Sequence, residues 1–335
     1  MNSIKIALLF VIGSILFSNF TVAEAQICSE TMLAAKSGVW KASPLKDSTT
    51  NVSPADLTRE KSVLANVHKT VAANYTPTGL EALYSNSFGG ANPSSGKNWA
   101  ADYYVYSVYL FAFLCDPASA DKSKSYTAVA TATTLNIHVN WIPQLDTLYA
   151  AELADDDLRG YLKMKRMPQK KNGFYYFGED FQGDPRDNIK VQTWLITHDD
   201  QLPFKYVSRR EYLLLTKKRL EKTISEDSTG KGFYDQYLNR INSSLNESEA
   251  ELSKPAICRW NDEERFAGFV EEDTKGSFIA VKPNPAYYRK NLQKSVPQFF
   301  TVAFKVAGSQ KIYTNNMESL QKAFDFNALR NMLGK

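Results

Sequence analysis

Residues 103–115, YYVYSVYLFAFLC, form an aromatic and apolar run that is broken by a single serine. Successive side chains of a β-strand point to opposite faces of the sheet, so a strand that is apolar on both alternating sets is covered on both faces. The run therefore predicts a central strand of a sheet. This feature constrains the fold most, because such a strand needs paired neighbours and a layer on each side.

A second run, residues 125–141, shows a clearer alternation of apolar and polar side chains. The apolar set, expected on one face, is Val129, Leu135, Ile137, Val139 and Trp141. The polar set, expected on the other face, is Asn136, His138 and Asn140. A polar linker with one proline, residues 116–124, separates the two runs. Two strands joined in this way predict a long antiparallel hairpin.

Helix signals occur on both sides of this hairpin. Ser53 and Pro54 suit the cap and the first position of a helix, and apolar residues follow at helical spacing, which predicts a helix over 54–73. The sequence Ser208-Arg209-Arg210-Glu211 has the pattern of a capping box and begins the first of two helices expected to form a helical hairpin. A final helix is expected over residues 317–332, at the C-terminal end.

Further strands complete the prediction of an α+β fold with antiparallel sheets. A strand is expected at residues 189–197, with 204–207 as its partner. Other candidate strands are residues 265–270, 277–281 and 297–306. No segment has the strand–helix–strand pattern of a parallel unit, so a parallel sheet is disfavoured. Two α+β domains are predicted, residues 26–150 and 151–335.

The N-terminal residues have the features of a signal peptide. Lys5 supplies a positive charge, and a run of apolar residues follows it, IALLFVIGSILF. Ala23-Glu24-Ala25 has the small residues that signal peptidase accepts, so cleavage after Ala25 and export to the periplasm or the cell exterior are expected. The apolar run is shorter than the roughly 20 residues that a membrane-spanning helix needs. The alternative interpretation is an uncleaved anchor or a buried helix.

Charge and composition exclude some classes of function. The formal net charge is +4, and removal of the signal peptide takes away one lysine and one glutamate, which leaves this value unchanged. Basic and acidic residues are evenly mixed, unlike the basic stripe of a nucleic-acid-binding protein, so no nucleic acid is expected as a partner. No later apolar run is long enough to span a membrane, and no cofactor-binding motif is present, so no cofactor is expected.

The sequence contains three cysteines, Cys28, Cys115 and Cys258. An oxidising compartment allows one disulfide with one remaining thiol, and three pairings are open. Three reduced thiols in the core are the alternative. The spacing of the cysteines does not match a metal-binding or redox motif.

Two segments, Leu202–Leu213 (LPFKYVSRREYL) and Tyr287–Phe300 (YYRKNLQKSVPQFF), resemble uncharacterised exported bacterial proteins. The resemblance covers a small part of the chain, and the residues that carry it form a turn and a helix cap. It implies a bacterial exported setting and no particular activity.

Two sets of residues are candidates for ligand binding. The first set is Asn136, His138 and Asn140, whose polar side chains are expected on one face of a strand. The second set is Tyr175 and Tyr176, which belong to an aromatic run that can stack on sugar rings. A solvated sheet face and ordinary core packing are the competing interpretations.

A third set, His198, Asp199 and Asp200, is a candidate site for a divalent cation. Aspartate is also a favoured turn residue, so an ordinary turn is the alternative. Complete motifs of zinc proteases and serine hydrolases are absent from the sequence. We therefore expect a non-catalytic protein that binds a small molecule or a protein through an aromatic-bearing sheet. The alternative is a hydrolase that uses carboxylates or a metal near His198.

Overall fold

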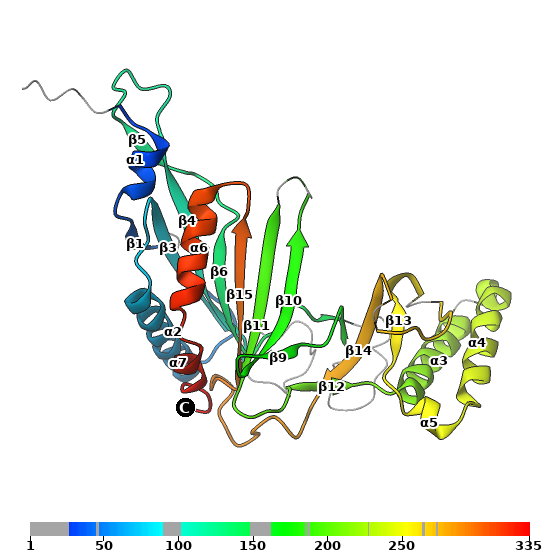
Figure 1. The fold of residues 1–335 in the computed structure, drawn as a ribbon. Helices are drawn as coiled ribbons and strands as arrows, with labels where there is room; N and C mark the ends of the chain where they lie inside the picture. Colours follow the sequence, from blue (N-terminus) through cyan, green and yellow to red (C-terminus); the bar gives the residue numbers. More distant parts are fainter. Residues whose placement is uncertain are drawn as a thin grey trace, which may run out of the picture.

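The computed structural model describes residues 27–44, 47–89, 102–147, 162–184, 186, 188–226, 228–262, 265–272 and 274–335. The predicted signal peptide, residues 1–25, lies outside the described residues, as do residues 148–161 around the predicted domain boundary. The described residues have an α+β fold with two sheets, in which antiparallel pairing dominates (Figure 1).

The larger sheet contains ten strands among the described residues, and β1-β3-β4-β6-β15-β11-β10-β9 is their main order. Their bounds are β1 Val39–Ala42, β2 Ser48–Thr49, β3 Leu80–Phe88, β4 Tyr104–Cys115, β5 Ser125–Thr127, β6 Thr134–Val139, β9 Gln169–Lys171, β10 Phe174–Gln182, β11 Ile189–Thr197 and β15 Phe299–Ala307. Strands β1 and β2 pair with β3 in parallel, and the other neighbours are antiparallel.

The predicted long hairpin is confirmed, because β4 pairs antiparallel with both β5 and β6. The second run is divided into two strands, and Val129, between them, is 94% exposed. Leu135, Ile137 and Val139 are fully buried on the face predicted as apolar. Strand β4 itself places Tyr104, Tyr106, Val108 and Leu110 in the same core.

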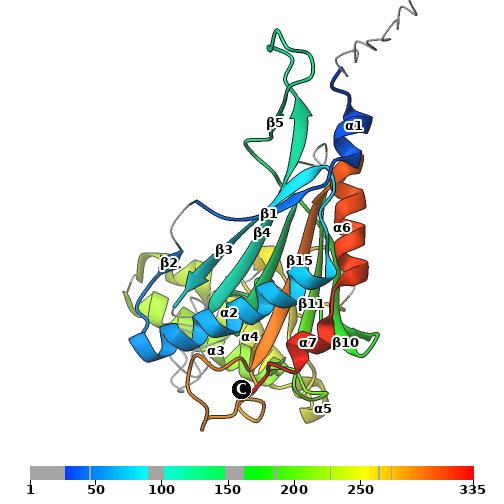
Figure 2. The ribbon, with the colours of Figure 1, turned by 90° about the vertical axis from the view of Figure 1, so that its left-hand side faces the viewer.

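Helices cover one face of the larger sheet: α2 (Pro54–Asn74), α6 (Lys311–Ala323) and α7 (Phe326–Arg330) (Figure 2). The Ser53 hydroxyl accepts a hydrogen bond from the Asp56 amide at the start of α2, as the sequence predicts. The expected final helix is divided, because Phe324 ends α6 and the Asp325 side chain caps α7 through the Ala328 amide.

The smaller sheet has the order β12-β14-β8-β7, with β13 beside β14. Its strands are β7 Asp146–Thr147, β8 Leu162–Met164, β12 Phe204–Tyr206, β13 Ile257–Arg259 and β14 Ser277–Pro283. The helical hairpin of α3 (Arg209–Glu226) and α4 (Lys231–Leu245) packs against it with α5 (Glu249–Leu252), which confirms the predicted hairpin (Figure 1). The short helix α1, Glu30–Ala35, lies near the start of the described chain.

Two strand predictions are wrong. Residues 204–206 pair with β14 and not with β11, because the chain leaves the larger sheet after Thr197. Residues 265–270 form no strand. The fully buried Phe266 packs in the core of the smaller unit, which the smaller sheet forms with α3, α4 and α5, and it is not part of a ladder of backbone hydrogen bonds.

The larger sheet does not divide at residue 150. Strand β6, from the first predicted domain, pairs along its whole length with β15, from the second. A third core cluster, which includes Leu195, Ile279 and Phe299, packs the two sheets against each other. Among the described residues, no helix combines the length and the apolar character that crossing a membrane requires.

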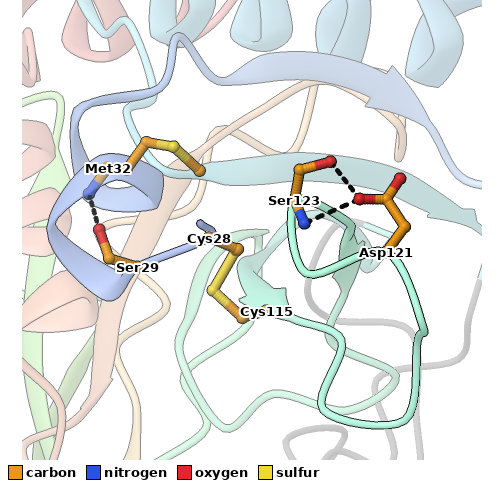
Figure 3. Close-up of a disulfide and its surroundings, with 6 residues drawn as sticks. All are labelled: Cys28, Ser29, Met32, Cys115, Asp121 and Ser123. Atoms are coloured by element: carbon orange, nitrogen blue, oxygen red, sulfur yellow. Dashed lines mark hydrogen bonds between the residues drawn. A yellow bond between two sulfur atoms is a disulfide. The ribbon is translucent and has the colours of Figure 1, made fainter. Parts of the chain in front are cut away.

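Cys28 and Cys115 form a disulfide that joins the segment before α1 to the end of β4 (Figure 3). This resolves the three pairings left open by the sequence, and Cys258 is a buried thiol in the core of the smaller unit. A structural disulfide indicates an oxidising location, in agreement with export.

Candidate functional site

A cavity of about 240 Å³ lies where the end of β11 meets the start of β10 and the end of α7. Its lining residues are Gly173, Phe174, Tyr175, Thr197, His198, Asp199, Asp200 and Arg330. Strands β10 and β11 are antiparallel, with Tyr175 opposite Leu195, so the first residues of one strand lie beside the last residues of the other. Tertiary structure therefore brings three separate segments to one cavity.

The β9–β10 turn forms one wall of this cavity. Asn172 and Gly173 both have positive φ, 53° and 79°, and they connect Lys171 directly to its partner Phe174. A two-residue hairpin turn of this type requires positive φ at both central residues, and the Asn-Gly pair adopts this conformation with little backbone strain. The turn places Phe174 and Tyr175 at the cavity.

His198 lies between two acceptors. Its Nδ1 is 2.6 Å from a carboxylate oxygen of Asp199, and its Nε2 is 3.2 Å from the carbonyl oxygen of Tyr287. The ring also stacks on Tyr287, with a centroid distance of 4.3 Å. Because a carboxylate and a carbonyl only accept, both contacts are hydrogen bonds only when each ring nitrogen carries a hydrogen. A neutral imidazole carries one ring hydrogen and donates in only one of the two contacts.

Asp200 is held by two neighbours. The Lys170 ammonium is 2.6 Å from its Oδ2, and the Tyr175 hydroxyl donates to its backbone carbonyl at 2.8 Å. The hydrogen bond and the charge of Lys170 lower the pKa of the Asp200 carboxyl. Burial raises the pKa of the Tyr175 hydroxyl, which therefore acts as a hydrogen-bond donor and not as an anion.

Arg330, the last residue of α7, completes the cavity. Its guanidinium donates to the carbonyl oxygen of Gly173 and lies over the Phe174 ring, 4.1 Å from the centroid. This contact ties the C-terminal helix to the β9–β10 turn. The cavity thus combines aromatic walls with cationic and anionic groups.

Four of the predicted site residues, Tyr175, His198, Asp199 and Asp200, meet in the cavity. Tyr176 does not line this cavity and lies on the opposite face of β10 from Tyr175. Its ring packs on Trp194, at a centroid distance of 4.5 Å, on the face that carries α7. The predicted tyrosine pair is therefore divided between the two faces of the sheet.

Asn136 and His138 lie on one face of β6, as predicted, and within a polar network. Asn136 accepts from the Ser107 hydroxyl at 2.8 Å and donates to the Thr134 hydroxyl at 3.1 Å. His138 stacks on Tyr103, and burial lowers the pKa of its imidazole to about 4. The amide of Asn136 is thus already engaged by the protein itself.

Asn140 does not lie with Asn136 and His138. It follows β6 with a φ of 58° and is fully buried. Its side-chain amide donates to the carbonyls of Asp102 and Val296, and its side-chain oxygen accepts from the Gln298 amide. These contacts give Asn140 a structural role at the strand end.

Within the described residues, no group of three His, Cys, Asp or Glu side chains is arranged to hold a metal ion. In the predicted set, the carboxylates of Asp199 and Asp200 contact different partners, the His198 ring and the Lys170 ammonium. Another cavity, of about 230 Å³ between α6 and β11, contains none of the predicted site residues. Comparison with protein-family models, curated proteins and solved structures found no match for this chain.

Sequence reasoning missed Arg330, Lys170 and Gly173 as site residues. The Asn172-Gly173 pair was a usable signal, because it is the strongest short-range indicator of a hairpin turn. Arg330 had no such signal, because it reaches Gly173 across 157 residues of sequence.

Proposed function

We propose that this protein is a non-catalytic binding protein whose ligand is a small polar molecule held in the cavity around Tyr175, His198 and Arg330. The observation that carries the proposal is the convergence of two independently selected sets of residues, Tyr175 and His198–Asp200, on one cavity. Ligand pockets combine aromatic walls with a few polar groups that orient the ligand, and this cavity has both.

The chemistry of the cavity supports binding over hydrolysis. A general base needs a free lone pair within reach of the substrate. Both nitrogens of His198 face acceptors, and the Asp200 carboxylate is bonded to Lys170. The groups that a hydrolase would use are therefore engaged in internal pairs, which hold the wall of the cavity in place.

The size of the cavity restricts the ligand. A volume of about 240 Å³ is below the range of pockets for drug-sized molecules, roughly 300–1,000 Å³. A small metabolite, or one residue of a larger molecule, is the class that fits. Tyr175 offers a ring face for packing and a hydroxyl oxygen that can accept one more hydrogen bond.

We further propose that the protein acts after export, with residues 1–25 removed as a signal peptide and Gln26 as the first residue of the mature chain. The Cys28–Cys115 disulfide supports an oxidising compartment. Mass spectrometry of the protein purified from its export route tests the cleavage site, and a mass that retains residues 1–25 contradicts it.

Calorimetric titration of the purified protein with small acids, amines, amides and sugars tests the binding function. The matched variants are Tyr175→Leu, in the cavity, and Tyr176→Leu, on the opposite face. Loss of an aromatic contact is worth about 0.5–1.5 kcal/mol beyond burial, so Tyr175→Leu is expected to weaken binding by about tenfold. Tyr176→Leu is expected to leave the affinity within about twofold.

Two outcomes contradict the proposed function. One is the absence of binding by every class of probe to a protein that is shown to be folded. The other is a ligand whose affinity falls with Tyr176→Leu and is unchanged by Tyr175→Leu, which would place its site on the other face of the sheet.

A further inference from the structure

We infer that the ligand of this cavity is an uncharged sugar residue, with its hydroxyl groups bound by the aspartates and Arg330 and its ring packed on Tyr175. The inference rests on the proposed function and adds the chemical class of the ligand. It follows from two properties of the cavity. Its charges balance, and it offers hydrogen-bond acceptors and donors together.

The charged side chains around the cavity number two of each sign when His198 is a neutral imidazole. Asp199 and Asp200 are the anions of the lining, and Arg330 is its cation. The second cation is Lys170, whose ammonium is 2.6 Å from Asp200. Lys170 first, and then the charge of Arg330, lower the pKa of the Asp200 carboxyl. Among the described residues, the cavity therefore offers a charged ligand no excess of opposite charge.

The two carboxylates supply acceptors. Oδ2 of Asp199 is 2.6 Å from the His198 ring, and Oδ2 of Asp200 is 2.6 Å from the Lys170 ammonium. Within the described part of the chain, Oδ1 of each aspartate makes no hydrogen bond. The two side chains are 61% and 84% exposed, so these oxygens are open to a ligand. A charged acceptor forms a stronger hydrogen bond with a hydroxyl than a neutral acceptor does.

Arg330 supplies donors to the same cavity. Its guanidinium has five N–H groups, and the Gly173 carbonyl accepts from one terminal nitrogen, Nη2. The guanidinium lies 4.1 Å from the centroid of the Phe174 ring, and this packing orients the other donors. The Tyr175 hydroxyl donates to the Asp200 carbonyl and keeps lone pairs with which to accept. A hydroxyl group is the neutral partner for such a mixture, because it both donates and accepts.

The aromatic wall and the size of the cavity select a ring. The Tyr175 side chain is partly exposed at the cavity, where an apolar face of C–H groups can pack on it. A volume of about 240 Å³ is below the range for drug-sized ligands, so it suits one sugar ring and not a chain of them. Anions, cations and zwitterions lose the hydration of their charges on entering, whereas an uncharged sugar has no charge to desolvate.

Sugars with one ring and different charges test the class: glucose against glucosamine and glucuronate, and galactose against its amine and its uronate. Affinities are measured by calorimetric titration of the purified protein at neutral pH, in low and moderate salt. At least one neutral sugar is expected to bind about tenfold or more tightly than both of its charged forms. Its affinity is expected to change little with salt, because the sugar carries no charge. Glycine and alanine are the zwitterion probes.

Two variants shift the charge balance in opposite directions. Arg330→Gln removes a cation, so the amino sugar is expected to gain about tenfold relative to the neutral sugar. Asp199→Asn removes an anion, so the uronate is expected to gain by a similar factor. Both shifts are expected to shrink as salt rises. Asp199→Asn also provides the test if Arg330→Gln does not fold.

Arg186→Gln and Asp184→Asn are the matched controls. These two residues form an exposed ion pair between β10 and β11, at the end of the strands away from the cavity, and neither lines it. Their replacement changes the net charge of the protein in the same way as the cavity variants. The preference among the three sugars is expected to stay within about twofold of the wild type.

The trimer of the neutral sugar that binds separates two sources of the residue. Tighter binding of the trimer assigns the residue to a glycan, and equal affinity assigns it to a free sugar. Both results support the sugar class, because the bound ring is the same.

The outcomes separate this inference from the proposed function. An amino sugar, a uronate or a zwitterion that binds the wild type more tightly than every neutral sugar overturns the sugar class and leaves a binding site in place. A preference that neither Arg330→Gln nor Asp199→Asn shifts overturns the charge balance at the site. Absence of binding by every probe contradicts the proposed function as well.

Discussion

The amide of Gly89 donates a hydrogen bond of 2.8 Å to Oε2 of Glu60, a fully buried carboxyl on α2. The other oxygen of this carboxyl, Oε1, has no hydrogen-bond partner among the described residues. Glu60 thus joins the helix layer to the end of β3 through one of its two carboxyl oxygens. Burial raises its pKa to about 7, with the charges of Asp102 and Asp56 acting in the same direction and the Gly89 amide acting against them.

The raised pKa of Glu60 predicts that the contribution of this residue to stability is lost as pH rises from about 4.5 to about 7, while the lowered pKa of His138 acts in the opposite direction. In this interval the folded state holds the proton on Glu60 more tightly than the unfolded state does, so the contribution of Glu60 to the free energy of unfolding falls with pH. Above pH 7 Glu60→Gln, which has no charge to bury, is expected to raise that free energy by about 1 to 3 kcal/mol. Urea unfolding at pH 5, 6, 7 and 8 measures both effects.

Glu318→Gln, on the exposed side of α6, is the control for this pH series, and its unfolding curve is expected to follow that of the wild type. A difference in unfolding free energy between Glu60→Gln and the wild type that does not grow between pH 5 and pH 8 contradicts the assignment.

The disulfide predicts a large loss of stability when its cysteines are replaced. Cys28 and Cys115 are separated by 87 residues, so the cross-link restricts a long loop of the unfolded chain. The double variant Cys28→Ser, Cys115→Ser is expected to lose about 2–4 kcal/mol of unfolding free energy. Cys258→Ser is the control for the pairing: thiol titration under denaturing conditions should find one thiol in the wild type and none in this variant.

The buried amide of Asn140 predicts a stability cost that depends on the replacement. Asn140→Ala loses the hydrogen bonds to Asp102, Val296 and Gln298, each worth about 1 kcal/mol, and places alanine at a φ of 58°. Asn140→Gly loses the same bonds without the backbone strain, so it is expected to be about 1 kcal/mol more stable than Asn140→Ala. Equal melting curves for the two variants speak against a strained backbone at this position.

Gly173 and Gly232 form a matched pair for the turn beside the cavity. A methyl group at either position meets no atom within 4 Å, so only backbone conformation distinguishes them. Gly173→Ala puts alanine at a φ of +79° and is expected to cost about 1–2 kcal/mol. Gly232→Ala, near the start of α4, is expected to stabilise by up to about 1 kcal/mol. Chemical unfolding at one pH compares them directly.

Local patterns in the sequence were sufficient for much of the fold. The start of α2 depends on Ser53 and Pro54, and the hairpin of β4 with β6 depends on alternation within single strands. Such signals are accurate because the interacting groups lie within one or two turns or along one strand. They failed at residues 204–206 and 265–270, where the choice of a partner strand depends on distant parts of the chain.

The candidate site was only partly accessible from sequence, for the same reason. The choice of Tyr175, His198, Asp199 and Asp200 rested on residue type and local order. Alternation along β10 places Tyr175 and Tyr176 on opposite faces, and only the tertiary structure shows that Tyr175 is the one that lines the cavity.

The sequence by itself determined the α+β class, the antiparallel hairpin, the helical hairpin and the segments that carry polar and aromatic candidates. Only the tertiary structure decided that Cys28 pairs with Cys115, that β6 and β15 join one sheet, and that Arg330 reaches the turn at Gly173. Helix caps and strand alternation are properties of neighbouring residues. Contacts across tens to hundreds of residues depend on how all the apolar faces are buried together, which no local pattern specifies.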